Sequence, residues 1–494
     1  MAKPAEKDRT FARNKWIYSL GGIGRDLAYS LYTYFLLTFI LYTKDVTDGQ
    51  FAAISIIMII CRIWDGINDP IMGGIIENTR SRFGKFKPWI LIGAITNAIV
   101  LALIFSIPLK GTAYVIAFPF LYLIWDMTYT MNDIGYWSML PSLTSEPRER
   151  DIITSMSNLF AGLGTILANG LIPILTVGKM AIGNSAVTGY KVVSIVIALL
   201  FIGCQSFVCA GVKEKPLKPA PAEKTGFKQM VKIILNNKQV LWTAFMLLFV
   251  NLSGTLLTAF GTNYIYLSYG YEGSFTTIFV VFYGAASGLS FVIYPIMTKF
   301  MKRIQIVRIS FITTIIGYAA FMLTGTFIKN ATVSFYVLCV ESLFIGLGYS
   351  LIYLIGAVCL SNTIEYNELI TGERNEALIF SVRPFMTKLS SSLQQVIIMI
   401  VYLAIGLTDI TNKISNAENS ALSDPATWTT EYKASYIESV LSGASDGMTF
   451  ALRCVMAILP VVFMAVGFYI ISKKYKIDEE EYNKILAKLK AKEK

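Results

Sequence analysis

One short segment of the chain places four polar side chains inside an apolar run that begins near residue 50. Arg62, Asp65, Asn68 and Asp69 are spaced i, i+3, i+6 and i+7, so they share one face of a helix. A charge at the centre of a bilayer costs about 2.5–3.5 kcal/mol, so this face must pair internally or line a wet cavity. The carboxylates and the amide oxygen could hold a hard monovalent cation, and the carboxylates could instead hold a proton. The alternative is a structural ion-pair network that includes Arg62.

A second polar segment covers residues 125–137. Thr130, Asp133 and Trp137 are spaced i, i+3 and i+7, and Asp126 lies seven residues before Asp133, near the same stripe. A carboxylate accepts hydrogen bonds from sugar hydroxyls, and an indole ring stacks against the C–H face of a sugar. Trp137 alone could be an interfacial aromatic residue. With Asp133 four residues away, the pattern favours contact with a sugar.

Charged residues also interrupt the first and a late apolar run. Arg25 and Asp26 follow a glycine-rich stretch, and they either form an adjacent ion pair or line the same cavity. Lys388 lies within an apolar run and needs a counter-ion, for which Asp65 and Asp69 are candidates. The candidate partners of Arg383, five residues before Lys388, are Glu341, Asp126 or an acidic substrate.

The composition is that of a membrane protein. Of 494 residues, 54% are hydrophobic and only 15% are charged, and the mean hydropathy is +0.57. The net charge of +11 comes from Lys and Arg in loops and tails, so it does not indicate nucleic acid. The chain has no histidine, and its six cysteines form no metal-binding pattern. We therefore expect no enzyme, no cofactor beyond a coupling ion, and no nucleic-acid partner.

Apolar runs long enough to span a bilayer recur along the whole chain. They lie at about 17–42, 50–74, 89–108, 113–140, 152–177, 191–211, 239–268, 275–298, 307–328, 333–361, 377–407 and 448–472. Lys and Arg concentrate in every second loop and in both tails, which predicts cytoplasmic termini by the positive-inside rule. The sequence thus predicts an all-α integral membrane protein with twelve transmembrane helices.

A proline-containing, lysine-rich stretch divides the chain into two sets of six predicted helices. The predicted parts are an N-terminal half (1–212), a cytoplasmic linker (213–238), a C-terminal half (239–472) and a cytoplasmic tail (473–494). Such a division favours a two-half transporter with a midplane site. The long polar loop 409–446 could form a short amphipathic helix or a partial lid.

Two sequence motifs resemble those of a known family. Residues 62–73 (RIWDGINDPIMG) and 79–89 (TRSRFGKFKPW) closely resemble the signature of the glycoside–pentoside–hexuronide:cation symporters, which belong to the major facilitator superfamily. Further matches are the GRD of residues 24–26, the MTYT of 127–130 and the EY of 365–366. The resemblance covers most of the chain and implies cation-coupled sugar uptake by alternating access.

The resemblance also implies roles for individual residues. The cation site would consist of Asp65, Asn68, Asp69 and Thr130, which would hold Na⁺ if the coupling ion is sodium. The substrate site would include Arg25, Asp26, Tyr129, Asp133 and Trp137, and Lys388 and Arg62 would couple the two sites. Two substrate positions depart from the family pattern, because Asn158 stands where an arginine is expected and Tyr353 where a tryptophan is expected.

Taken together, the expectation is a multi-pass protein of the inner or plasma membrane with the major facilitator fold. It would carry a glycoside, pentoside or hexuronide with Na⁺ or H⁺, and membrane lipid would surround it. The alternatives are an uncoupled sugar facilitator and, in a different class, a transport-inactive membrane sensor.

Overall fold

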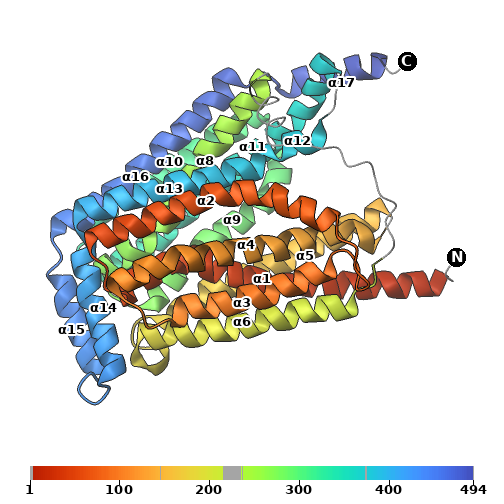
Figure 1. Ribbon diagram of the computed structural model, residues 1–494. Coiled ribbons are helices and arrows are strands. Elements are labelled where there is room, and N and C mark those ends of the chain that lie inside the picture. The colour runs from red at the N-terminus through yellow and green to blue at the C-terminus, as the bar shows by residue number, and fades with distance from the viewer. Residues whose placement is uncertain (1–3, 145, 215–234, 236, 373–374, 493–494) are drawn as a thin grey trace. The chain divides into compact units, whose positions relative to one another are not determined.

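A computed structural model describes residues 4–144, 146–214, 235, 237–372 and 375–492, and these residues form helices and no strand (Figure 1). They pack into two compact units. The first unit is Met1–Ala222 with Tyr271–Thr277 and Gly406–Ala444. The second is Glu223–Gly270, Ile278–Ile405 and Ser445–Lys494. The linker predicted at 213–238 lies mostly outside the described residues.

The first unit is a helical bundle in which neighbouring helices run side by side. Its helices are α1 (Pro4–Thr43), α2 (Asp48–Glu77), α3 (Lys87–Ser106), α4 (Gly111–Leu143), α5 (Pro147–Thr176), η1 (Ile182–Asn184) and α6 (Ala186–Gly211). α1 packs against α5 and α6, while α4 packs against α2 and α3 (Figure 1). Local signals fix the ends: Thr47 and Gln50 form a capping box at the start of α2.

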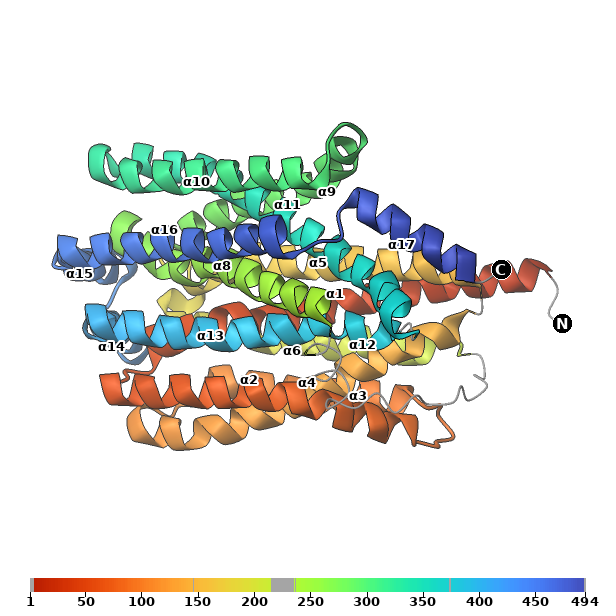
Figure 2. The same ribbon diagram turned by 90° about the horizontal axis from the view of Figure 1, so that it is seen from above.

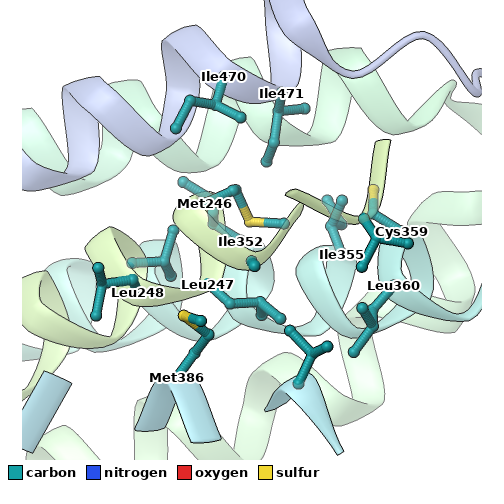
Figure 3. Close-up of a cluster of buried hydrophobic side chains, with 14 of the residues drawn as sticks. Met246, Leu247, Leu248, Ile352, Ile355, Cys359, Leu360, Met386, Ile470 and Ile471 are labelled. Atoms are coloured by element: carbon teal, nitrogen blue, oxygen red, sulfur yellow. The ribbon is translucent and has the colours of Figure 1, made fainter. Parts of the chain in front are cut away.

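The second unit is built from the later helices around its own core. These helices are α8 (Lys238–Tyr269), α9 (Gly273–Phe300), α10 (Arg303–Phe327), α11 (Ala331–Thr371), α12 (Glu376–Phe380), α13 (Val382–Ile405), α16 (Asp446–Tyr469), η2 (Ile470–Lys474) and α17 (Glu479–Lys492). Met246, Leu247, Ile352, Ile355 and Ile470 belong to the buried cluster between α8, α11 and η2 (Figure 3). The first residues of α9, up to Thr277, pack with the first unit.

The long polar segment that follows α13 is helical and well packed. It forms α14 (Leu407–Ser423) and α15 (Thr430–Ser442), which lie side by side (Figures 1 and 2). Sequence analysis proposed one short helix or a partial lid here. The structure instead has two helices that belong to the first unit, although the flanking helices α13 and α16 belong to the second.

Ten helices among the described residues are long and apolar enough to cross a membrane. They are α2, α3, α5, α6, α8, α9, α10, α11, α16 with η2, and the stretch Leu378–Ile405 that includes α13. α1 and α4 fall outside this set. Both helices contribute polar residues to the candidate site described below.

Candidate functional site

The polar face of α2 meets α4 at one hydroxyl. Thr130 Oγ1 lies 3.3 Å from Oδ1 of Asp65 and 3.5 Å from Oδ1 of Asp69. Asp65, Asn68 and Thr130 are buried, and Asp69 is half-buried. Asn68 Nδ2 has no hydrogen-bond partner among the described residues. Two carboxylates from α2 and one hydroxyl from α4 therefore come together, and the predicted spacing places both aspartates on the same face of α2.

Arg62 stands one turn before Asp65 on α2 and points into an aromatic environment. It is within electrostatic reach of Asp65 and of the hydroxyls of Tyr29, Tyr32 and Tyr122. Tyr32 belongs to α1 and Tyr122 to α4, and their rings are 5.2 Å apart. The half-buried guanidinium therefore lies within electrostatic reach of groups on α1, α2 and α4, with Asp65 as the carboxylate among them.

A second polar group joins α1 to α4. Arg25 donates from Nε and Nη2 to Oδ2 of Asp26, at 3.0 and 2.7 Å, and its Nη1 lies 3.2 Å from Oδ1 of Asp133. The guanidinium also lies over the rings of Tyr136 and Trp137, with its Cζ 4.6 and 4.9 Å from their centroids. The structure thus has the adjacent ion pair and extends it to Asp133, while the lining of a cavity by Arg25 and Asp26 stays a prediction.

Close helix packing fixes the position of Arg25. A Cβ on Gly164 of α5 would lie 2.5 Å from the carbonyl oxygen of Ile23, and one on Gly22 would lie 3.3 Å from that of Ser157. The absence of side chains at these two positions lets α1 and α5 approach closely. Tyr18 and Tyr136 then tie α1 to α4, since each hydroxyl donates to the backbone carbonyl of the other, at 2.7 and 2.6 Å.

An aromatic stack connects the two polar groups. Tyr129 stacks on Tyr29 at 5.0 Å and on Trp125 at 5.1 Å, and Trp125 stacks on Tyr32 at 3.4 Å. Asp126, next to Trp125, is 4% exposed and so is not open to a ligand in this conformation. Sequence analysis named Tyr129 but missed the three other rings of the stack, Tyr29, Tyr32 and Trp125. Their spacing, i and i+3 on α1 and i and i+4 on α4, is a signal that could have found them.

The remaining predicted residues lie elsewhere. Asn158 is exposed on α5 and makes no hydrogen bond or ion pair with described residues. Tyr353 and Arg383, both in the second unit, contact each other: Nε and Nη2 of Arg383 donate to the hydroxyl of Tyr353, at 3.2 and 2.8 Å. Tyr353 was not among the partners considered for Arg383. Lys388 is half-buried in the second unit, one turn further along α13.

The chemistry of the first unit suits ligand binding rather than bond cleavage. Its carboxylates are organised by a hydroxyl and by a guanidinium, and the chain has no histidine. No group of three or more His, Cys, Asp or Glu side chains that could hold a metal ion occurs in the described part of the chain. The oxygen-rich set on α2 and α4 instead resembles what a hard monovalent cation requires.

Comparison with known proteins identifies the class. Residues 17–479 match the family model described as "MFS/sugar transport protein". Lactose permease of Leuconostoc lactis is 28% identical over 81% of this chain, and the chain spans 64% of that permease's length. The raffinose carrier protein of Pediococcus pentosaceus is 23% identical over 98% of this chain and 72% of the carrier.

A solved structure of a bacterial homologue of the human lysosomal transporter Spinster, in an inward-facing conformation, has a TM-score of 0.60. It is 12% identical and covers 97% of this chain and 100% of the homologue. The fold is therefore the all-helical fold of the major facilitator superfamily. The chain therefore belongs to the family of MFS/sugar transport proteins, and its relatives place it with the glycoside–pentoside–hexuronide transporters of that superfamily; these relatives are membrane transporters and not enzymes.

Proposed function

We propose that the protein carries a glycoside, pentoside or hexuronide across the cell membrane together with Na⁺ or H⁺, by alternating access. The observation that supports this best is the convergence of Asp65, Asp69 and Thr130 oxygens in a buried part of the first unit. The cation is a co-transported substrate. Na⁺ would take oxygen ligands from these three residues and from Asn68, and H⁺ would instead bind to one of the carboxylates.

The sugar would bind at the second polar group. Asp26 and Asp133 offer acceptors to sugar hydroxyls, Arg25 offers donors, and Trp137 and Tyr129 offer rings for stacking. The names of the relatives, a lactose permease and a raffinose carrier, support a saccharide. We further propose that Tyr353 and Asn158, the two positions that depart from the family pattern, contribute to the choice of sugar.

Coupling would depend on which positive charge occupies the carboxylates of the cation site, the co-transported cation or Lys388. Arg62 stands beside Asp65, and Lys388 would compete with the cation for the carboxylates during the transport cycle. Occupation of the site by a cation would release Lys388, so that cation and sugar binding favour the same conformations.

We also propose that twelve helices, α1 and α4 among them, span the bilayer and that both termini are cytoplasmic. The placement of Lys and Arg supports this orientation.

Transport by purified protein in proteoliposomes tests the proposal. A panel of radiolabelled glycosides, pentoses and hexuronides is offered under an inward Na⁺ gradient, an inward H⁺ gradient, or neither. We expect accumulation of at least one sugar above its external concentration, which collapses when an ionophore dissipates the driving gradient. Equilibration without accumulation would indicate a facilitator. Binding of sugar without any flux would indicate a sensor.

A further inference from the structure

The hairpin formed by α14 and α15, residues Leu407–Ser442, contains a charged pair that is almost completely shielded from solvent. Lys433 Nζ lies 3.2 and 3.1 Å from the two carboxylate oxygens of Glu418 and donates to the carbonyl oxygen of Asn184, at 2.8 Å. The side chains of Lys433 and Glu418 are 2% and 0% exposed. The Ala186 N–H donates to Oε2 of Glu418, at 2.7 Å. All three N–H groups of the ammonium thus have acceptors, two in the Glu418 carboxylate and one at Asn184, the last residue of η1.

The hairpin also makes hydrogen bonds to the end of α1, the connection between α1 and α2, and the start of α2. Asn412 accepts from the N–H of Val46 and donates to its carbonyl oxygen, at 3.0 and 2.9 Å. Asn419 donates to the carbonyl of Thr43, at 3.1 Å, and Thr408 donates to the carboxylate of Asp48. Fully or nearly fully buried side chains at helical spacing form the packed face of α14; they are Leu407, Thr411, Ile414, Ala417, Glu418 and Ala421. The hairpin is therefore a fixed part of the first unit.

Short links join this docked hairpin to the second unit. Only Gly406, which has a φ of +67°, separates the end of α13 at Ile405 from the start of α14. Residues 443–445 separate α15 from α16. At about 3.3–3.6 Å per extended residue, the two links span at most roughly 7 and 14 Å between the helix ends. While the hairpin is docked, the linked ends of α13 and α16 must stay within these distances of it.

Alternating access requires the two halves of such a transporter to separate at each end of the bundle in turn. We propose that the α14–α15 hairpin is a strap, meaning a helical tether that remains docked on the first unit throughout the cycle. It would limit how far the second unit can move away at the end of the bundle where the α1–α2 connection lies. Gly406 and residues 443–445 are its hinges. The shielded Glu418–Lys433 pair keeps the hairpin docked on the first unit, because removing either partner would leave a buried charge unpaired.

Lengthening the links tests the strap directly. In a variant whose six cysteines are replaced, spin labels are attached through Lys110→Cys in the α3–α4 connection and Lys329→Cys in the α10–α11 connection, both exposed. A flexible Gly/Ser insert of about six residues, with a reach of roughly 13 Å, is placed after Gly406 and after Gly443. We expect the distance distribution between the labels to extend to longer distances. The matched control carries the same insert at the exposed tip, after Ala426, and should leave the distribution unchanged.

A distribution that is unchanged by the link inserts would overturn the proposal. A second experiment tests whether the strap stays docked. Asp48→Cys and Thr408→Cys, whose parent side chains are in contact, are added to the label variant and oxidised to a disulfide before the two label sites react with a maleimide spin label. We expect the same distance distribution as in the labelled protein without this cross-link. A narrower distribution in the cross-linked protein would mean that the hairpin undocks from the first unit as the transporter opens, which contradicts a permanent tether.

Discussion

Thr130 Oγ1 lies near the carboxylates of both Asp65 and Asp69, although one hydroxyl can donate to only one of them at a time. The helical spacing of Asp65, Asn68 and Asp69 was enough to predict that they share a face, because helix geometry fixes it. The spacing did not reveal that Arg25 bridges Asp26 and Asp133. Its second partner comes from α4, and the approach of α1 to α4 depends on packing that no local pattern encodes.

The substitution Asp69→Asn tests the proposed cation site. It keeps the size of the side chain and removes the charge on which both Na⁺ binding and proton binding would depend. We expect the stimulation of sugar uptake by a Na⁺ or H⁺ gradient to disappear, with accumulation reduced by about tenfold or more, equivalent to a loss of about 1.4 kcal/mol. Gradient-driven uptake in proteoliposomes measures this. Asp424→Asn, at an exposed position outside the bundle, serves as the control. Full coupled accumulation by Asp69→Asn would refute the assignment.

Arg25→Lys tests the proposed sugar site. A lysine keeps the charge but cannot reach Asp26 and Asp133 in the same forked geometry while lying over two rings. The loss of a charge-assisted hydrogen bond, about 1.5–3 kcal/mol, predicts sugar binding that is roughly 10- to 100-fold weaker. Equilibrium binding to purified protein is the measurement, with Arg82→Lys in an exposed loop as the control. Unchanged affinity in Arg25→Lys would exclude Arg25 from the substrate site.

At the scale of helices, hydropathy predicted the apolar segments well and the hairpin poorly. The buried face of α14 mixes Leu407, Ile410 and Ile414 with small and hydroxylated residues and one glutamate, so the segment has neither the length nor the apolarity of a spanning helix. Its stability depends on Lys433 and Asn184, which are distant in the sequence. Such a pairing cannot be read from the periodicity of α14, and only the packed structure shows that the loop belongs to the first unit.

Lys433→Met tests the contribution of the buried pair to this packing. Breaking a buried ion pair from one side costs about 3–5 kcal/mol, whereas replacing both charges by apolar groups is often close to neutral. We therefore expect amide hydrogen exchange within residues 407–442 to accelerate strongly in Lys433→Met and to return towards the native rate when Glu418→Leu is added. Exchange measured by mass spectrometry reports both effects, and amides of α3 serve as the internal reference. Equal protection in the native protein and in Lys433→Met would show that the pair does not hold the hairpin in place.

At the scale of the whole molecule, orientation in the membrane follows from charge rather than from packing. The α2–α3 connection contains Arg80, Arg82 and Lys85, and Lys87 follows at the start of α3, whereas the α3–α4 connection contains only Lys110. The positive-inside rule therefore predicts that these connections lie on opposite sides, with the arginine-rich one in the cytoplasm.

Cysteine labelling in intact cells tests this orientation. Lys110→Cys and Arg82→Cys each place a thiol at an exposed position, while the six native cysteines are buried or half-buried. A membrane-impermeant maleimide should label Lys110→Cys in intact cells, and Arg82→Cys only after the membrane is permeabilised. The unsubstituted protein gives the background for both. If Arg82→Cys reacts in intact cells and Lys110→Cys does not, the termini lie outside. The strap would then restrain the cytoplasmic opening instead of the extracytoplasmic one, since the α1–α2 and α3–α4 connections share one end of the bundle.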